Sequence, residues 1–211
     1  MQALFDHGAR EPVLDYGSGW GGLTEKLLAG GFDTLGLELS LEMTDYCRKH
    51  NLPVEQGDIT IVQGRIFRTL VLCTVFEHLV EHESWLVRAN RLLEPGGLLV
   101  TLQPTAPFAD FMGRLTRLGN LNAPLPSLHR VFCPPWHTAF FSLEGLEILI
   151  SRHGFELLEI RPAPQGRERG VVGVAQAGLE VMNRLGWNLL GRKWPLLTSH
   201  IFILRKDSKC T

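Results

Sequence analysis

The chain has few of the features that mark secreted, membrane-spanning or nucleic-acid-binding proteins. It has only four cysteines in 211 residues and no Cys-x-x-Cys pair, which is typical of reduced thiols in the cytoplasm. It has no run of about 18 uncharged apolar residues that could span a membrane, and no basic N-terminal segment leads into an apolar run as in a signal peptide. The formal net charge of −1 offers no positive field to nucleic acid. We therefore expect a cytoplasmic protein without a nucleic-acid partner.

The residues that are present suit one α/β domain covering 1–211, because 45% of them are hydrophobic and can build one substantial core. Apolar runs alternate with segments of helical periodicity. The expected strands are 12–16, 34–39, 53–56, 69–75, 98–103, 155–160 and 199–205, and the expected helices are 22–29, 41–50, 84–93 and 143–153. The pattern predicts a Rossmann-like, doubly wound sheet of seven strands, mostly parallel with the last strand antiparallel.

Local signals place the ends of several of these elements. Ser40 and Ser142 are suitable N-caps for the helices that follow them. Pro95, Gly96 and Gly97 are expected to form a sharp turn into the fifth strand.

The most informative segment is Val-Leu-Asp-Tyr-Gly-Ser-Gly-Trp-Gly-Gly at 13–22. A strand, a tight glycine turn and a helix start predict a nucleotide cradle, in which glycine takes positive φ and exposes bare backbone to a ligand. The glycines fit both the dinucleotide pattern G-x-G-x-x-G and the pattern D-x-G-x-G-x-G. The carboxylate of Asp15 would repel a pyrophosphate but suits a sulfonium and an amino group. The segment therefore favours S-adenosylmethionine (SAM) over NAD.

Acidic residues also follow the next two strands, and the carboxyl ends of parallel strands meet along one rim of a sheet. Glu38 lies 21 residues after Gly17, a spacing that suits an acceptor for ribose hydroxyls; the alternative is a surface glutamate at a strand end. Asp58 could accept from an adenine amino group while Ile59 packs on the ring. The alternative is that the preceding Gly57 and Asp58 form a common turn.

Three further segments complete a resemblance to a known family. They are Cys-Thr-Val-Phe-Glu-His-Leu at 73–79, Leu-Glu-Pro-Gly-Gly-Leu at 93–98 and His-Thr-Ala-Phe-Phe-Ser at 137–142. Taken in this order with the glycine turn, they make the chain similar to the small-molecule class I SAM-dependent methyltransferases over 12–103 and 137–160.

The resemblance implies SAM as the cofactor, with the glycine turn against its methionine part, Glu38 on the ribose and Asp58 on the adenine. It implies that Asp15 organises the loop near the amino group and that Cys73 and Thr74 line the cofactor through their backbone. The cofactor-binding residues expected are Asp15, Gly17, Ser18, Gly19, Gly21, Glu38, Leu39, Asp58, Ile59, Cys73 and Thr74.

Two histidines are candidates for the catalytic base that a hydroxyl acceptor would need at neutral pH. His78 is the first candidate because it follows the fourth strand, and His137 is the second because it follows an irregular region. The alternative for each is a helix-terminal histidine that hydrogen-bonds to backbone. His78, Glu81 and His82 also fit the zinc-peptidase pattern H-x-x-E-H, but no third ligand is evident. We therefore expect no metal.

Two irregular inserts, at about 104–136 and 161–198, are expected to form the acceptor site; the first holds a helix at 108–118 and the second an apolar helix near 171–190. Their large side chains could line an apolar or aromatic acceptor pocket, or could instead cover the sheet: Phe108, Phe111, Met112, Phe132, Trp136, Trp187 and Trp194. The helix near 171–190 is expected to be a lid or packing helix, with a dimer face or contact with a membrane surface as alternatives.

About a dozen residues precede the first strand, where family members usually carry one or two helices. Either the chain is shortened at this end or the inserts take over that role.

These observations predict a SAM-dependent methyltransferase that acts on a small molecule, with O-methylation favoured. One alternative is an NAD-dependent oxidoreductase, which would need a Tyr-x-x-x-Lys pair; neither Tyr16 nor Tyr46 has a lysine four residues on. The other alternative is a SAM-binding module without turnover.

Overall fold

The computed structural model of the protein describes residues 1–119, 137–164 and 169–208. Within these residues the sheet has seven strands in the order β3-β2-β1-β4-β5-β7-β6. The strands are β1 (Val13–Tyr16), β2 (Thr34–Glu38), β3 (Val54–Gln56), β4 (Phe67–Cys73), β5 (Leu93–Pro104), β6 (Phe155–Pro162) and β7 (Ser199–Lys206). Neighbours from β3 to β5 pair in parallel, whereas β7 is antiparallel to both β5 and β6. The predicted doubly wound sheet with an antiparallel last strand is confirmed.

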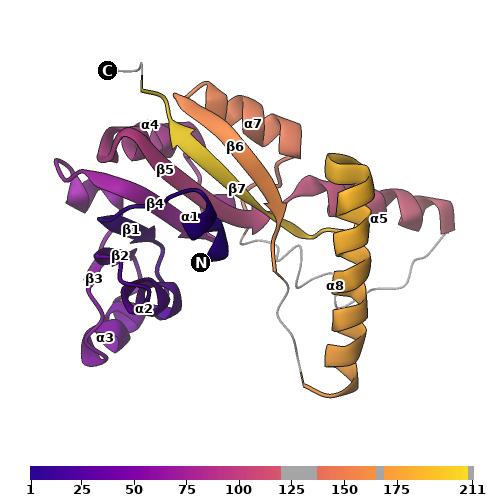
Figure 1. The fold of residues 1–211 in the computed structure, drawn as a ribbon, viewed down its shortest axis with the longest axis horizontal. Helices are drawn as coiled ribbons and strands as arrows, with labels where there is room; N and C mark the ends of the chain where they lie inside the picture. The colour runs from indigo at the N-terminus through magenta and orange to yellow at the C-terminus, as the bar shows by residue number, and fades with distance from the viewer. Residues whose placement is uncertain (120–136, 165–168, 209–211) are drawn as a thin grey trace.

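Helices cover both faces of the sheet, while α5 and α8 stand to one side of it (Figure 1). The helices are α1 (Gln2–Asp6), α2 (Gly22–Ala29), α3 (Leu41–Lys49), α4 (His82–Leu92), α5 (Ala106–Gly119), α7 (Leu143–Ser151) and α8 (Val171–Leu190). Three short 3-10 turns are η1 (Ile59–Val62), η2 (Phe76–His78) and η3 (Gly191–Lys193). Among the described residues, no helix is long and apolar enough to cross a membrane.

The strand residues divide between two hydrophobic cores because successive side chains of a strand point to opposite faces. Leu14 and Leu70 belong to the larger core, with Trp85 of α4 and Leu146 of α7. Val13 and Val71 belong to the smaller core, with Leu4 of α1 and Leu27 of α2. Burial on both faces explains why the central strands are continuous apolar runs rather than alternating ones.

The expected helix caps are present at α3 and α7. The Ser40 side chain accepts from the backbone N–H of Met43 at 3.4 Å, and the Ser142 side chain accepts from that of Gly145 at 2.9 Å. Each hydroxyl satisfies a donor that has no partner within its helix, which stabilises a helix start by about 1 kcal/mol.

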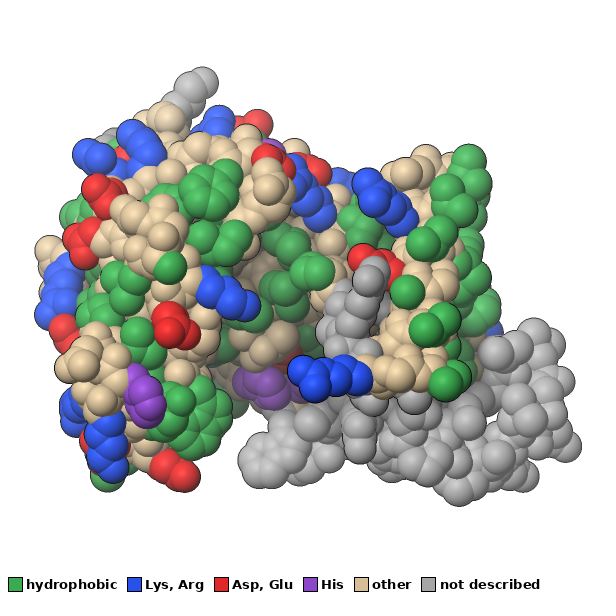
Figure 2. Space-filling view, turned by 60° about the horizontal axis from the view of Figure 1, so that its bottom comes forward, with side chains coloured by type: hydrophobic (Ala, Val, Ile, Leu, Met, Phe, Trp, Pro, Cys, Tyr) green, Lys and Arg blue, Asp and Glu red, His purple; other side chains and the backbone are tan. Residues whose placement is uncertain are grey.

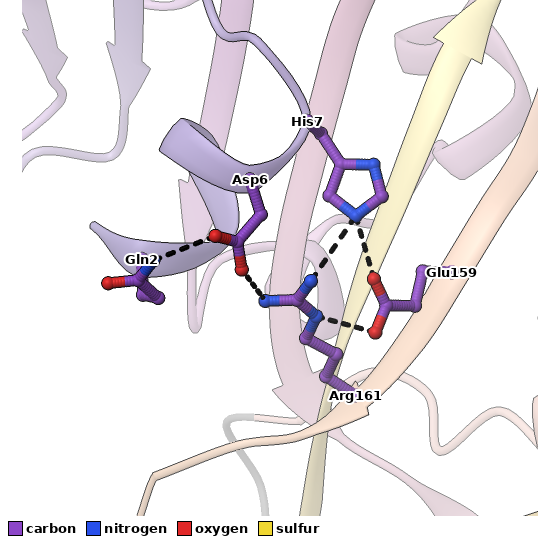
Figure 3. A network of polar contacts seen from close by, with 5 residues as sticks. All are labelled: Gln2, Asp6, His7, Glu159 and Arg161. Carbon is purple, nitrogen blue, oxygen red and sulfur yellow. Dashed lines mark hydrogen bonds and ion pairs between the residues drawn. The ribbon is translucent and has the colours of Figure 1, made fainter.

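Helix α1 was not predicted, and it supplies a short cover for the smaller core. A polar network holds it against β6 (Figure 3). Arg161 donates to Asp6 of α1 at 2.6 Å and to Glu159 at 2.6 Å, while Glu159 also pairs with His7 at 2.7 Å. Hydrogen bonding to the Arg161 guanidinium lowers the pKa of both Asp6 and Glu159.

Most strand ends lie within one or two residues of the prediction, and the differences at β5 and β4 have a clear physical cause. Strand β5 begins at Leu93 and not after a sharp turn, because Pro95, Gly96 and Gly97 are absorbed as an irregularity: Leu93 pairs with Phe67, and the next pair is Leu98 with Thr69. Strand β4 ends at Cys73 and not at 75, since Thr74 has a φ of 56°. Left-handed backbone at Thr74 cannot continue the ladder and turns the chain into η2.

Candidate active site

A cavity of about 530 Å³ lies beyond the carboxyl ends of β1, β2 and β4. It brings together eight of the eleven residues expected to bind the cofactor: Asp15, Gly17, Ser18, Gly19, Glu38, Leu39, Cys73 and Thr74. His78 also lines it, together with residues that the sequence did not single out: Tyr16, Leu23, Leu37, Met43, Gly57, Val75 and Leu79. Most of these flank the predicted positions, so only their neighbourhood could have suggested them.

The three glycines of the turn all have positive φ, at 73° for Gly17, 56° for Gly19 and 78° for Gly21. Their surroundings differ. A Cβ on Gly19 would meet no atom of the described chain within 4 Å, so this backbone is open to a ligand. A Cβ on Gly17 would overlap Val75, and one on Gly21 would come within 2.5 Å of Leu52. Gly21 therefore serves close packing in the structure and does not line the cavity.

Glu38 joins the glycine turn to the start of α3. One carboxylate oxygen accepts from the backbone N–H of Gly19 at 2.8 Å, and the other accepts from that of Ser40 at 2.9 Å. A carboxylate can accept about four hydrogen bonds, so Glu38 keeps capacity for hydroxyl groups that enter the cavity. Its place in the cavity wall and its remaining lone pairs fit a ribose.

Asp15 is a buried carboxylate in the floor of the cavity, with 1% of its surface exposed. It accepts a hydrogen bond from the Thr24 hydroxyl at 2.7 Å. Burial raises the pKa of Asp15 to about 6, because desolvation disfavours the charged form. A cationic ligand group nearby would favour the carboxylate again, which fits the sulfonium or amino group of SAM.

Asp58 and Ile59 stand apart from the cavity lining. The Asp58 carboxylate accepts from the backbone N–H and the hydroxyl of Thr60 and so caps η1. These hydrogen bonds lower the pKa of Asp58. Ile59 is buried in the larger core. Their expected contact with adenine stays a prediction, and Gly57 is the residue of this turn that reaches the cavity.

A second cavity of about 490 Å³ shares Thr74 with the first. Its walls come from the strand ends and from both inserts: Thr74, Leu102, Phe108, Ala163, Pro164, Leu179, Leu196, Thr198 and Ser199. Among the aromatic residues expected here, Phe108 lines this cavity, whereas Trp187 packs on the larger core and Trp194 donates to Asn183 at 2.9 Å. Phe132 and Trp136 lie outside the described residues.

Helix α8 is both a wall of this second cavity and a surface element. Leu179 faces the cavity, and Asn183 is buried. The opposite side of the helix exposes a line of apolar side chains, which Figure 2 shows along its outer edge: Val171, Val174, Val181, Leu185 and Leu189. The side of α8 that carries Leu179 and Asn183 therefore packs against the rest of the protein.

The two candidate catalytic histidines lie together although 59 positions separate them in the chain. The ring centroids of His78 and His137 are 4.9 Å apart. The backbone N–H and the hydroxyl of Thr138 both donate to the Glu77 carbonyl, at 2.8 and 2.9 Å, which holds this segment against η2. Glu77 is buried, and burial raises its pKa to about 7. A buried carboxylate beside two imidazoles was not expected from the sequence.

The H-x-x-E-H pattern does not form a metal-binding face. The His82 ring pairs with the carbonyl of Phe76 at 3.0 Å and packs on Phe141. Glu81 is exposed and precedes α4. His82 is thus a helix-start histidine bonded to backbone, and burial lowers its pKa.

Comparison with known proteins agrees with this geometry. Residues 1–160 match a family model described as a methyltransferase domain. An uncharacterized methyltransferase of Geobacillus kaustophilus is 29% identical over 161 residues, 70% of each chain. A ubiquinone biosynthesis O-methyltransferase of Methylococcus capsulatus is 31% identical over 98 residues, 42% of this chain and 41% of that protein.

The fold agrees with a solved SAM-dependent methyltransferase from Archaeoglobus fulgidus, with a TM-score of 0.64 at 18% identity over 97% of this chain and 92% of the other. The family match over residues 1–160 excludes the NAD-dependent oxidoreductase considered above. Together with the cavity and its carboxylates, it shows that the chain belongs to the methyltransferase-domain family and is a SAM-dependent methyltransferase.

Proposed function

We propose that the enzyme transfers the methyl group to a hydroxyl oxygen of a small, apolar acceptor bound in the second cavity. The observation that carries the proposal is the position of this cavity. It shares Thr74 with the cofactor cavity, and aliphatic and aromatic side chains make up most of its wall. The Methylococcus capsulatus relative, named for O-methylation in ubiquinone biosynthesis, supports an oxygen acceptor on an apolar molecule.

The chain's contribution to the reaction is mainly positioning. Bound SAM supplies an electrophilic methyl group on a sulfonium sulfur. Glu38 and the open backbone at Gly19 would hold the ribose and the amino-acid part, and Asp15 would sit near the cationic groups. The walls of the second cavity would bring the acceptor oxygen into line. Well-oriented groups can supply roughly 7–11 kcal/mol of a barrier.

The hydroxyl must also lose its proton, because a neutral hydroxyl is a poor nucleophile. His78 lines the cofactor cavity, and the ring of His137 packs against the ring of His78. We assign to this pair the removal of the hydroxyl proton, with His78 as the first candidate for direct contact.

The free cysteines Cys47 and Cys73 support a reducing, cytoplasmic location.

The test is turnover with SAM on matched acceptors that differ only in carrying a hydroxyl or an amine on the same apolar ring. A methyl ether identified by mass spectrometry is the expected product. Leu179→Asp should raise the KM for the acceptor at least tenfold without changing the affinity for S-adenosylhomocysteine, since Leu179 lines the second cavity only. Leu189→Asp, on the exposed side of the same helix, is the matched control.

Three results would count against the proposal. Methylation of the amine but not of the hydroxyl would contradict an oxygen acceptor. An unchanged acceptor KM in Leu179→Asp would place the acceptor outside the second cavity. Binding of S-adenosylhomocysteine without turnover on any acceptor would favour the non-catalytic SAM-binding module.

A further inference from the structure

We propose that Glu77, His78 and His137 form a binding site for one divalent cation of the zinc type at the edge of the cofactor cavity, which His78 lines. The binding of the ion stands on the geometry of these residues alone. The role that we give it in acidifying the acceptor hydroxyl rests on the function proposed above.

The three side chains converge on one point. One carboxylate oxygen of Glu77 and one ring nitrogen from each histidine all lie within 4.8 Å of one another. Bonds of about 2.0–2.2 Å from zinc to nitrogen and oxygen place tetrahedral ligands roughly 3.5 Å apart. Small rotations of the side chains would therefore close the three atoms around an ion. Among the described residues, this is the only such group of three or more potential ligands.

Glu77 gives an independent sign that a ligand belongs here. The residue is 1% exposed, yet its Oε2 atom has no hydrogen-bond partner among the described residues. A buried carboxylate oxygen without a partner destabilises the fold, because the hydrogen bonds it made to water are not replaced. The imidazoles of His78 and His137 lie next to the Glu77 carboxylate. A cation shared with them would satisfy this oxygen and bring the three ligands together.

Main-chain contacts hold the backbone segments of the site together. Glu77 and His78 belong to η2, which follows directly from the left-handed turn at Thr74. His137 comes from a distant segment, but its neighbour Thr138 is fastened to the Glu77 carbonyl by two hydrogen bonds. The distance between the ligands is thus set by main-chain contacts and not by exposed side chains alone.

The donor set indicates the class of ion and its chemistry. Two imidazoles and one carboxylate form a set typical of catalytic zinc, and they leave a coordination position open. His78 lines the cofactor cavity, and the two cavities meet at Thr74, so an acceptor whose hydroxyl extends past Thr74 into the cofactor cavity would reach the open position. A hydroxyl oxygen bound there becomes more acidic: its O–H bond breaks, both electrons stay on oxygen and the proton passes to solvent water. In the loaded protein the histidines act as ligands, and the ion takes over their role in proton removal.

The test measures Zn²⁺ retained by the full chain after equilibrium dialysis, with elemental analysis of the dialysed protein. The wild type should retain about one ion per chain. Glu77→Gln and His137→Ala should each weaken binding at least tenfold. Glu81→Gln is the matched control, because it makes the same chemical change four residues away on an exposed side chain.

Three further measurements keep the result interpretable. His78→Ala alters an exposed residue and should weaken binding even if Glu77→Gln fails to fold. Binding of S-adenosylhomocysteine by each variant reports whether the sheet is intact. Replacing Zn²⁺ by Co²⁺ should give absorption bands of nitrogen and oxygen ligands. A thiolate charge-transfer band would instead place the ion on a cysteine and overturn the proposal.

The proposal is also overturned if the wild type retains no ion, or if the Glu77, His78 and His137 variants retain it as the wild type does. Methyl transfer that persists in a chelator, with no ion bound, would refute the role of the ion in acidifying the hydroxyl and leave the O-methyltransferase proposal intact. An ion bound by these residues, with no methyl ether formed on any hydroxyl acceptor, would refute the O-methyltransferase proposal and leave the ion site intact.

Discussion

Removing the Glu38 carboxylate should weaken binding of S-adenosylhomocysteine by about 10²–10⁴-fold. The carboxylate holds the backbone N–H groups of Gly19 and Ser40 at 2.8 and 2.9 Å and lines the cavity. Hydrogen bonds to a charged group contribute roughly 1.5–3 kcal/mol each. Two such bonds to ribose hydroxyls would amount to about 3–6 kcal/mol, and each 1.4 kcal/mol is a factor of about ten in affinity. Glu38→Ala also frees the Gly19 N–H, so the turn loses its support.

Isothermal titration calorimetry with S-adenosylhomocysteine measures this effect directly. Glu38→Gln keeps one acceptor oxygen but turns an amide donor toward a backbone donor, so we expect an intermediate loss of about 10–100-fold. Glu42→Gln, on an exposed residue in the first turn of α3, should bind within about twofold of the wild type. Glu38→Ala that folds normally and binds within tenfold of the wild type would refute the assignment of Glu38 to the ribose.

Three further expectations concern stability, measured as the free energy of unfolding in urea. Gly178→Ala should stabilise α8 by about 0.5–1 kcal/mol, because the added Cβ meets open space. Gly186→Ala should destabilise the protein by about 1–3 kcal/mol, because the added Cβ overlaps the ring of Trp194. A change of the same sign in both variants would contradict the packing of α8. Burial lowers the pKa of His200 to about 4, so the wild type should lose up to about 3 kcal/mol as pH falls from 6.5 to 4 through protonation of the unfolded state, and His200→Gln should lose less. Burial raises the pKa of Asp15 to about 6, so the contribution of Asp15 to the free energy of unfolding falls as pH rises from 3.8 to 6. Asp15→Asn should remove this fall. An unchanged pH dependence of stability in the His200 or Asp15 variant would contradict the burial of that group.

The fold was largely predictable because its signals are local. Apolar runs separated by glycine turns and helical periodicity located all seven strands to within a few residues. The errors arose where sequence-distant contacts compete with a local signal. Pro95, Gly96 and Gly97 look like a turn, yet pairing of Leu93 with Phe67 draws the segment into β5. Helix α1 has little pattern of its own and depends on burial of Leu4 against the sheet.

The site was predictable only in part. The residues that end strands reach the cavity because topology brings strand ends together: Asp15, Glu38 and Thr74 are examples. Asp58 lies two residues beyond the end of β3, but its carboxylate accepts hydrogen bonds from Thr60. The three glycines look equivalent in the sequence, although only the neighbours of each one decide whether it faces a ligand or a side chain. The H-x-x-E-H spacing was visible, but its first histidine, His78, lies beside His137, and its second, His82, bonds to the Phe76 carbonyl.

The amino-acid sequence is enough to predict the order of strands and helices, the glycine turn and the acidic strand ends, because these depend on backbone preferences and on the period of apolar residues. Which distant groups meet depends on packing in three dimensions. The approach of His137 to Glu77, the shared wall of the two cavities and the overlap of Gly186 with Trp194 all depend on how separate segments pack. Spacing along a chain carries no record of such distances, since packing fixes them only after the sheet has formed.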